Sequence, residues 1–399
     1  MARTKMTMST GGQIAEHLSV GVLARSYPRE RVRDILQRMD LESKRERDLP
    51  AEALVYYIIA LGLFMAVSTG EVLRCLIEGL QWLDGAPAKL KAAGKSAISQ
   101  GRSRLGAAPL KALWDECAAP MSKAGQLGSF YREWRLVSID GSTLDLPDTE
   151  ENLAHFGRSQ SSRGQAAFPQ MRFASLCENG PHAIFSVRFG ACKTSENALA
   201  RDLLVDLKPG MLCLADRLYT TLPLWKMAGE TGAALLWRAR INAELPVEEL
   251  LADGSYLSRI YPSEKAKRQK KGGITVRVIE YELEGAKDAE PLYRLITTLL
   301  DPEAAPAVEL AALYPDRWEI EIVLDEFKTH LRGGRVVLRS KTPELVAQEF
   351  WGMMLAHRAV RSLMQEAALP QNRDPDRLSF THSIRVIRRK LAAAPVLSP

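Results

Sequence analysis

The spacing of apolar residues predicts helices over the first third of the chain. Residues from about 20 to 125 carry apolar side chains at helical spacing, in segments such as SYPRERVRDIL and STGEVLRCLIEGLQWL. Between these segments, residues 53–67 read ALVYYIIALGLFMAV and are apolar throughout. A membrane span needs roughly 20 such residues. The run therefore predicts a buried helix that starts at Pro50, with Ser68 or Thr69 capping the helix after it.

From about residue 130 the pattern changes to alternation, which predicts strands. WRLVSIDGSTLDL predicts a strand that ends near Asp140, and MLCLADRLY predicts a short buried strand with Asp216 at its C-terminal end. FPQMRFASLCE, HAIFSVRFGAC and AALLWRAR are further strands, while ENALARDLLVDL and TLPLWKMAGETG have helical spacing. The order of three strands, helix, strand, helix, strand fits a mixed α/β sheet covered by helices, beginning with an antiparallel meander.

Residues 241–300 interrupt this alternation with a β-rich insertion. Its strand-like segments are LSRIYP, ITVRVIEYEL and YRLITTLL, and SEKAKRQKKGG forms a basic loop between the first two. A loop of this kind is a candidate cationic contact, and it is equally typical of a solvated hairpin tip. After Asp301 and Pro302 the pattern is helical to about residue 367.

The sequence thus predicts four regions. They are a disordered N-terminus (1–18), a helical DNA-binding domain (19–125), an α/β catalytic domain (126–367) that contains the insertion, and a basic C-terminal helix and tail (368–399). The prediction that the helical domain binds DNA rests on a short basic helix. Ser96 would cap this helix, and Arg102 and Arg104 would lie on its exposed face. The alternative is an ordinary solvated basic helix.

Composition narrows the function only slightly. The 399 residues are 46% apolar and 26% charged with a net charge of +6, which is typical of a globular protein and weakly favours a nucleic-acid partner. The five cysteines are scattered without a CxxC pair, which favours a reducing compartment and argues against a disulfide or zinc framework. Because the N-terminus also lacks the apolar segment of a secretion signal, we expect a cytoplasmic, nucleoid-associated protein with no membrane partner.

Asp140 and Asp216 are the first candidates for chemistry. Each follows an apolar strand, and carboxylates at the ends of neighbouring strands point into a shared cleft. Two carboxylates that lie close together need a cation between them, and hard divalent cations bind through such oxygens. Either aspartate, taken alone, is also an ordinary turn residue.

A more specific pattern follows in ALYPDRWEIEIVLDEFKTHLRGG, which predicts a helix that ends at two glycines. Tyr314, Arg317, Glu321 and Lys328 are spaced 3, 4 and 7 positions apart, so a continuous helix would bring them to one face. That face would carry a phenol, a guanidinium, a carboxylate and an ammonium group. The alternative is an exposed helix with an ion pair between Arg317 and Glu321.

These residues form the pattern Y-x2-R-x3-E-x6-K, which resembles the signature of transposases of the insertion element 4 family. The preceding DGST and ADR segments resemble the two catalytic aspartate motifs of that family, in the same order. RERDLPAEALVYYIIALGLF and KSAISQGRSRLGAAPL resemble its N-terminal domain, and VLRSKTPELVAQEFWGMMLAHRAVR resembles the segment after the signature. The resemblance implies a ribonuclease H-like mixed sheet with helices on both faces and a β-rich insertion, after an all-helical N-terminal domain.

The resemblance also implies a function. Asp140, Asp216 and Glu321 would be the catalytic and metal-binding residues of a DNA transposase that cuts insertion-sequence ends and joins them to target DNA. Two Mg²⁺ ions would serve as cofactors, with Mn²⁺ able to replace them. The partners would be double-stranded DNA, both terminal inverted repeats and target, and a second copy of the chain in a homodimer.

The DNA-binding residues implied by the resemblance are Tyr314, Arg317 and Lys328, which would bind phosphates beside the third carboxylate. Arg217 would contact phosphate or orient the second aspartate, and a capping role is the alternative. Tyr293 is a candidate for stacking on a flipped base. Packing within the sheet is its alternative, and Trp237 and Trp318 compete for the same role.

Two other functions share these features. A ribonuclease H-like nuclease would cut DNA without strand transfer, using the same carboxylates. A decayed copy would bind DNA without cutting it, although all three acidic positions are present. A purely structural module would leave the acidic strand ends and the signature unexplained.

Overall fold

The computed structural model describes residues 17–43, 49–74, 76, 93–161, 164–282, 292–333 and 337–389. The chain divides into two compact units. Unit 1 comprises Met1–Cys117, Glu326–Met364 and Ser379–Pro399, and unit 2 comprises Ala118–Asp325 and Gln365–Leu378. Of the disordered N-terminus predicted for residues 1–18, positions 1–16 lie outside the described residues, as does the tail from 390 onward. Residues 17 and 18 already belong to a helix.

Unit 1 is helical, as the apolar spacing predicts. Its elements are α1 (His17–Ser26), α2 (Arg29–Arg38), α3 (Ala51–Leu63), α5 (Lys95–Leu105), α6 (Ala108–Cys117), the π-helical turn η2 (Glu326–His330), most of α13 (Pro343–Ala368) and α14 (Phe380–Arg389). Helix α3 follows Pro50 and is buried along its whole length. Among the described residues, no helix has both the length and the apolar character needed to cross a membrane.

A close approach of α3 and α13 explains one glycine of unit 1. A Cβ atom on Gly352 would lie 2.7 Å from the carbonyl oxygen of Ile58, closer than real Cβ contacts allow. The small residue therefore permits the two backbones to meet. Helix α3 is thus a buried helix of unit 1, as its apolar sequence predicts.

The exposed basic face predicted for α5 is wrong for Arg102. Its side chain is 8% exposed and donates hydrogen bonds to Gln348 Oε1 and Ser340 Oγ, both at 2.8 Å. Arg104 is exposed as predicted. The helix begins after Gly94 without a side-chain cap, so Ser96 does not play the predicted capping role. Helical spacing alone does not show whether an arginine faces solvent or hydrogen-bonds to a buried amide.

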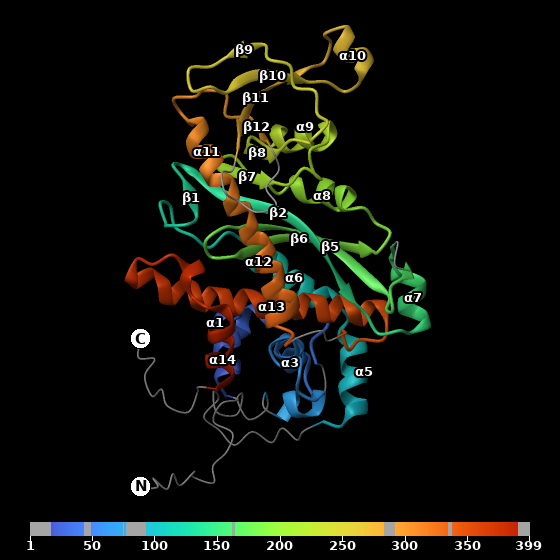
Figure 1. The fold of residues 1–399 in the computed structure, drawn as a ribbon. Coiled ribbons are helices and arrows are strands. Elements are labelled where there is room, and N and C mark those ends of the chain that lie inside the picture. Colours follow the sequence, from blue (N-terminus) through green and yellow to red (C-terminus); the bar gives the residue numbers. More distant parts are fainter. Residues whose placement is uncertain are drawn as a thin grey trace, which may run out of the picture. The chain divides into compact units, whose positions relative to one another are not determined.

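Unit 2 is built on one mixed sheet (Figure 1). Its strands are β1 (Phe130–Tyr131), β2 (Trp134–Asp145), β5 (Gln170–Glu178), β6 (Ala183–Ala191), β7 (Met211–Ala215), β8 (Ala234–Arg238), β9 (Glu249–Leu250), β10 (Tyr256–Ile260), β11 (Ile274–Tyr281) and β12 (Tyr293–Thr297). A separate small hairpin consists of β3 (Gln160–Ser161) and β4 (Gly164–Gln165). The helices are α7 (Glu150–Phe156), α8 (Glu196–Leu204), α9 (Leu222–Glu230), α10 (Glu264–Arg268), α11 (Ala307–Leu313), the 3₁₀ turn η1 (Tyr314–Trp318) and α12 (Glu319–Asp325), followed by the 3₁₀ turns η3 (Leu369–Gln371) and η4 (Pro375–Arg377).

The sheet has the predicted topology. Strands β6, β5 and β2 form an antiparallel meander, and β7 and β8 then add in parallel to β2 through crossovers that contain α8 and α9. One face of the sheet packs against α8 and α9, and the other packs against α11 and η1. This order of strands, with helices on both faces, confirms the mixed α/β fold predicted from the sequence.

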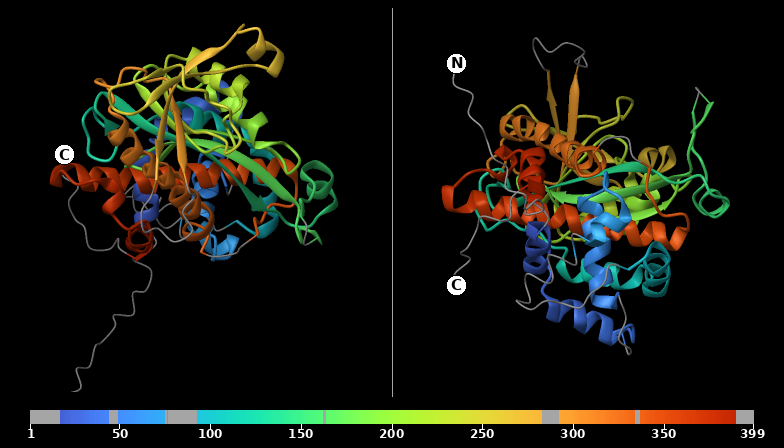
Figure 2. Two further views of the ribbon diagram at one scale, coloured as in Figure 1. Left: turned by 45° about the horizontal axis from the view of Figure 1, so that its top comes forward. Right: turned by 90° about the horizontal axis from the view of Figure 1, so that it is seen from below.

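The insertion continues the same sheet. Strand β12 pairs antiparallel with β8, and β11, β10 and β9 follow outward. Strands β11 and β12, orange in Figure 2, extend as a ribbon beyond the end of β8. The basic loop of the prediction folds instead as the short helix α10, because Ser263 caps it by accepting the backbone N–H of Ala266.

Candidate active site

Asp140 and Asp216 lie side by side in unit 2. Strands β2 and β7 pair in parallel with an offset of 76 positions, the same offset that separates Asp140 from Asp216. The prediction that the strand ends near Asp140 is wrong, because β2 continues to Asp145 by pairing with β5. The parallel partner β7 ends earlier, at Ala215. Both carboxylates therefore lie just beyond the last residues of the β2–β7 pairing.

Side-chain alternation places the two aspartates on one face of the sheet. In β2, Leu136 packs with the cluster that contains α11, whereas Val137 packs with the cluster that contains α8 and α9. Counting by twos from Leu136 puts Asp140 on the α11 face. Leu214 packs with the same cluster, so Asp216 shares that face. The signature segment follows α11 directly, and α12 contacts β2.

The signature segment is not the continuous helix that the sequence predicts. It changes from α11 to the 3₁₀ turn η1 and then to α12. Tyr314 and Arg317 are each 5% exposed. The Tyr314 hydroxyl donates to the carbonyl oxygen of Ala215 at 3.2 Å, and Arg317 Nη2 donates to Glu321 Oε1 at 2.9 Å. The 3₁₀ turn is thereby attached to the end of β7, beside Asp216.

The electrostatics show that these carboxyl groups act on one another. Burial raises the pKa of Asp140 from 3.8 to about 6. The hydrogen bond from the Gly141 N–H and the charge of Arg317 lower that pKa, whereas the charges of Glu321 and Glu196 raise it further. The negative charges of Glu321 and Glu196 thus add to the effect of burial, and an additional cation would stabilise the ionised form of Asp140.

Two neighbours of Asp140 were missed by the sequence analysis. Glu196, in the first turn of α8, lies against Gly141, where an added Cβ would be 3.0 Å from its Cγ and Cδ atoms. Tyr219 is fully buried, and the charges of Asp140, Glu196 and Asp216 all act on it. Glu196 follows the N-cap Ser195 and so has the position of an ordinary helix-start acid. The only sequence signal for Tyr219 is its place three residues after Asp216.

The donor chemistry fits a hard divalent metal ion, because the site offers several carboxylates and no thiolate. As placed, they are not drawn together. In the part of the chain that the structure describes, no three histidine, cysteine, aspartate or glutamate side chains come close enough to hold a metal ion. Glu321 is instead hydrogen-bonded to Arg317. Metal binding would therefore require these carboxylates to come closer together.

An open cavity of about 440 Å³ adjoins Asp216. Its lining includes two arginines, Arg217 and Arg240, and two exposed apolar side chains, Leu218 and Ile241. The Arg217 backbone N–H donates to Asp216, so this contact does not involve the arginine side chain, whose predicted role stays a prediction. Its exposed side chain lies on the cavity wall.

The three aromatic candidates have different surroundings. Trp237 is fully buried and packs edge-on against Trp225. Tyr293 pairs across the strands with Tyr281, with ring centroids 5.3 Å apart, and the Arg238 guanidinium lies 4.5 Å from the Tyr293 ring. Trp318 is 57% exposed and lies beside Arg317. Burial excludes Trp237 from stacking on a base, whereas Trp318 presents the most open ring of the three.

Lys328 lies in the π-helical turn η2, which belongs to unit 1. The helix is thus not regular from Tyr314 to Lys328, and the predicted single face does not follow from a constant helical period. The same turn begins with Glu326, which is buried and forms an ion pair with Arg361. This buried pair fixes the start of the turn within unit 1.

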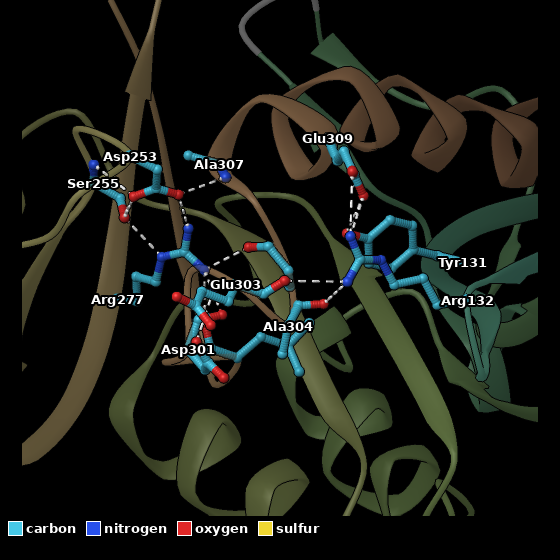
Figure 3. A network of polar contacts seen from close by, with 12 residues as sticks. Tyr131, Arg132, Asp253, Ser255, Arg277, Asp301, Glu303, Ala304, Ala307 and Glu309 are labelled. Atoms are coloured by element: carbon cyan, nitrogen blue, oxygen red, sulfur yellow. Dashed lines mark hydrogen bonds and ion pairs between the residues drawn. The ribbon is translucent and has the colours of Figure 1, made fainter.

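Two arginines anchor the segment that leads into α11 (Figure 3). Arg277 of β11 is fully buried and donates to Ser255 Oγ at 2.7 Å, to the Ala305 carbonyl at 2.6 Å and to Asp253. Asp253 also accepts the backbone N–H of Ala307, the first residue of α11, at 2.8 Å. On the other side, Arg132 pairs with Glu309 at 3.0 Å. The insertion thereby fixes where the signature segment begins.

Two family descriptions match the chain. Residues 17–115 match "Insertion element 4 transposase N-terminal", and residues 133–358 match "Transposase DDE domain". The second match contains all the carboxylates described above.

Individual proteins are also similar. The transposase InsG for insertion sequence element IS4 of Escherichia coli (strain K12) is 30% identical over 367 residues, which cover 89% of this chain and 79% of that protein. The cryo-EM structure of the piggyBac transposase synaptic complex with hairpin DNA has a TM-score of 0.44 and 12% identity, over 97% of this chain and 73% of that one.

Proposed function

Because this chain belongs to the insertion element 4 family of DDE transposases and mediates DNA transposition, we propose that Asp140, Asp216 and Glu321 are its catalytic residues and metal ligands. The observation that carries the proposal is the parallel pairing of β2 with β7 as far as Ser138 and Leu214, because the same register continued by two residues brings Asp140 level with Asp216. DDE transposases generally use divalent metal ions. We assign two Mg²⁺ ions, with Mn²⁺ as a substitute, because the ligands are hard carboxylate oxygens.

The reaction is phosphoryl transfer on DNA. A water oxygen attacks the phosphorus at the end of the element, the bond from phosphorus to the 3′ oxygen breaks, and that oxygen takes up a proton to become a 3′ hydroxyl. In the second step this hydroxyl loses its proton and its oxygen attacks a phosphorus of target DNA, releasing a 3′ hydroxyl from the target strand. Bound metal ions supply Lewis acidity to the attacking and leaving oxygens.

The protein's own residues position the strands and neutralise charge, since the reaction needs no protein nucleophile. Arg317 interacts with the carboxylates before DNA arrives, and its guanidinium is suited to a phosphate once Glu321 turns to a metal ion. Tyr314 holds η1 against the end of β7, because its hydroxyl is bonded to Ala215 and it is buried. Lys328 would add a further positive charge for phosphate.

The cavity beside Asp216 supports a path for one DNA strand. Arg217 and Arg240 offer positive charge to phosphates, and Leu218 and Ile241 offer apolar contacts to sugars and bases. For base stacking we favour the exposed Trp318, and Tyr293 would act through Arg238, which packs on its ring. Arg104 stays a candidate for phosphate contacts in unit 1. We give Arg102 a structural role instead, because its side chain donates hydrogen bonds within the protein. The DNA partners are the terminal inverted repeats and the target, held by a homodimer.

Arg317→Ala is expected to weaken binding to a duplex that carries the terminal repeat by about tenfold or more, because charge-assisted hydrogen bonds contribute about 1.5–3 kcal/mol. The slope of log affinity against log salt should fall by about one. Fluorescence anisotropy at several salt concentrations measures both quantities.

Lys208→Ala is the matched control for Arg317→Ala. It removes one exposed positive charge near the start of β7, at the end opposite Asp216. It should leave the affinity and the salt slope close to those of the wild type. Equal affinities for Arg317→Ala and the wild type would show that Arg317 does not contact DNA.

A further inference from the structure

Tyr219 has a buried hydroxyl group that none of the described residues hydrogen-bonds. The residue is 0% exposed, and its ring packs in the apolar cluster between the sheet and helices α8 and α9. Its backbone N–H donates to the Asp216 carbonyl at 3.1 Å, so the ring is held by the turn that carries the second aspartate. Among the residues that the structure describes, the hydroxyl oxygen has no hydrogen-bond partner.

Other buried tyrosines of the chain show the usual arrangement. Tyr27 and Tyr56 are each 1% exposed, and their hydroxyl groups donate to the carbonyl oxygens of Leu355 and Tyr27, both at 2.6 Å. Buried polar groups in native proteins are nearly always paired in this way, because an unpaired one loses its hydration without compensation. Phenylalanine would fill the apolar site of Tyr219 without that cost. The hydroxyl is therefore available to a partner that is not part of the protein.

The surroundings of Tyr219 indicate what that partner is. Burial, and then the charges of Asp140, Glu196 and Asp216, raise the pKa of Tyr219 well above its usual value, and Arg317 lowers it. The hydroxyl group of a tyrosine is a hydrogen-bond donor, and the backbone contact to Asp216 keeps this one at the turn that carries the second aspartate. Glu196 lies against Gly141, so this group of acids extends past Asp140 toward α8. A hydrogen-bond donor near this carboxylate site is suited to an oxygen atom that is bound to a cation.

We propose that the Tyr219 hydroxyl donates a hydrogen bond to an oxygen ligand that enters the carboxylate site, either a water molecule bound with the metal ion or a phosphate oxygen of DNA. Tyr219 is then a further binding residue of the active site, contributed by the turn that follows Asp216. The inference rests on the assignment of Asp140 and Asp216 as metal ligands. Both sources offer the same chemistry, an oxygen acceptor held by positive charge.

Tyr219→Phe removes the hydroxyl and keeps the ring. Without metal or DNA, its melting temperature should equal or exceed that of the wild type, because no protein contact is lost. Tyr27→Phe is the matched control: it removes a buried hydroxyl that is bonded to Leu355, and its melting temperature should fall. A lower melting temperature for Tyr219→Phe would show that the hydroxyl has a structural partner, which would overturn the proposal.

Two titrations then separate the sources of the oxygen. Calorimetry with Mn²⁺ in the absence of DNA should show affinity about 10–100-fold weaker for Tyr219→Phe if the acceptor is a metal-bound water, as for other groups that support metal ligands. If the acceptor is a phosphate, Mn²⁺ affinity should stay unchanged while affinity for the terminal-repeat duplex in Ca²⁺ falls. Wild-type behaviour in both titrations would overturn the proposal.

Asp216→Asn in the same titrations distinguishes this inference from the function it rests on. If Asp216→Asn loses Mn²⁺ binding and Tyr219→Phe matches the wild type in both titrations, only the inference about Tyr219 fails. If Asp216→Asn binds Mn²⁺ like the wild type, the carboxylate assignment itself fails, whatever Tyr219→Phe shows.

Discussion

Replacing Glu321 with glutamine is expected to abolish magnesium-dependent cleavage at the terminal repeat while leaving DNA affinity within a few-fold of the wild type. The substitution keeps the shape of the side chain and removes the negative charge that we assign to metal binding. Changing a group that only supports a metal ligand lowers metal affinity or activity about 10–100-fold. Removing a direct ligand should therefore lower the cleavage rate by more than about 100-fold. Cleavage rates on a labelled duplex, with anisotropy for binding, measure the two effects separately.

Asp325→Asn provides the matched control for Glu321→Gln. Asp325 lies one turn further along α12 and is exposed, so the change removes the same charge from the same helix. Its cleavage rate should stay near that of the wild type. If Glu321→Gln cleaved DNA as fast as this control, Glu321 would not be a metal ligand.

Arg277→Ala is expected to lower the free energy of unfolding by about 3–5 kcal/mol, the usual cost of removing one partner of a buried ion pair. Arg277 is fully buried, and its loss would remove the charged partner of Asp253 and the donor to the carbonyl oxygen of Ala305. Urea denaturation followed by circular dichroism measures the change, with the slope checked for two-state behaviour.

Arg132→Ala tests whether burial, rather than the number of contacts, sets this cost. Arg132 holds the same segment through Glu309, but both side chains of that pair are more than a third exposed. Exposed pairs contribute only about 0–1 kcal/mol. Similar losses for the two variants would contradict the view that the buried arginine fixes the start of α11.

The sequence predicted those features that depend on a regular period or on a motif. Alternation predicted the meander, the parallel strands and Asp216 at the end of β7. The end of β2 was misplaced at Asp140 because strand length is set by pairing, and β2 has a partner on each side that stops at a different residue. Asp140 nevertheless lies within β2, and Asp216 directly follows β7.

The signature segment shows a different limit. A constant period of 3.6 residues predicts one face for Tyr314 through Lys328, but the backbone passes through a 3₁₀ turn and a π-helical turn. These changes arise from tertiary contacts, such as the hydrogen bond from Tyr314 to Ala215 and the buried pair of Glu326 with Arg361. Neither contact joins residues close enough in sequence to leave a local pattern.

The residues that sequence reasoning missed or misjudged share a cause. Glu196 and Tyr219 reach Asp140 only because α8 and the turn after β7 fold beside it, so no spacing connects them in the sequence. Arg102 was misjudged for the same reason, since Gln348 and Ser340 are more than 200 positions away. Burial of a polar group can be inferred only when its distant partners are known.

The central claim is that carboxylates at the paired ends of β2 and β7 bind the metal ions that cut DNA. The most direct test is cleavage of a labelled duplex that carries the element's own terminal repeat, in magnesium, by the wild type and by Asp140→Ala. The account predicts magnesium-dependent nicking at the repeat end by the wild type and none by the variant. Equal cleavage by both proteins, or specific binding without cleavage by either, would contradict it.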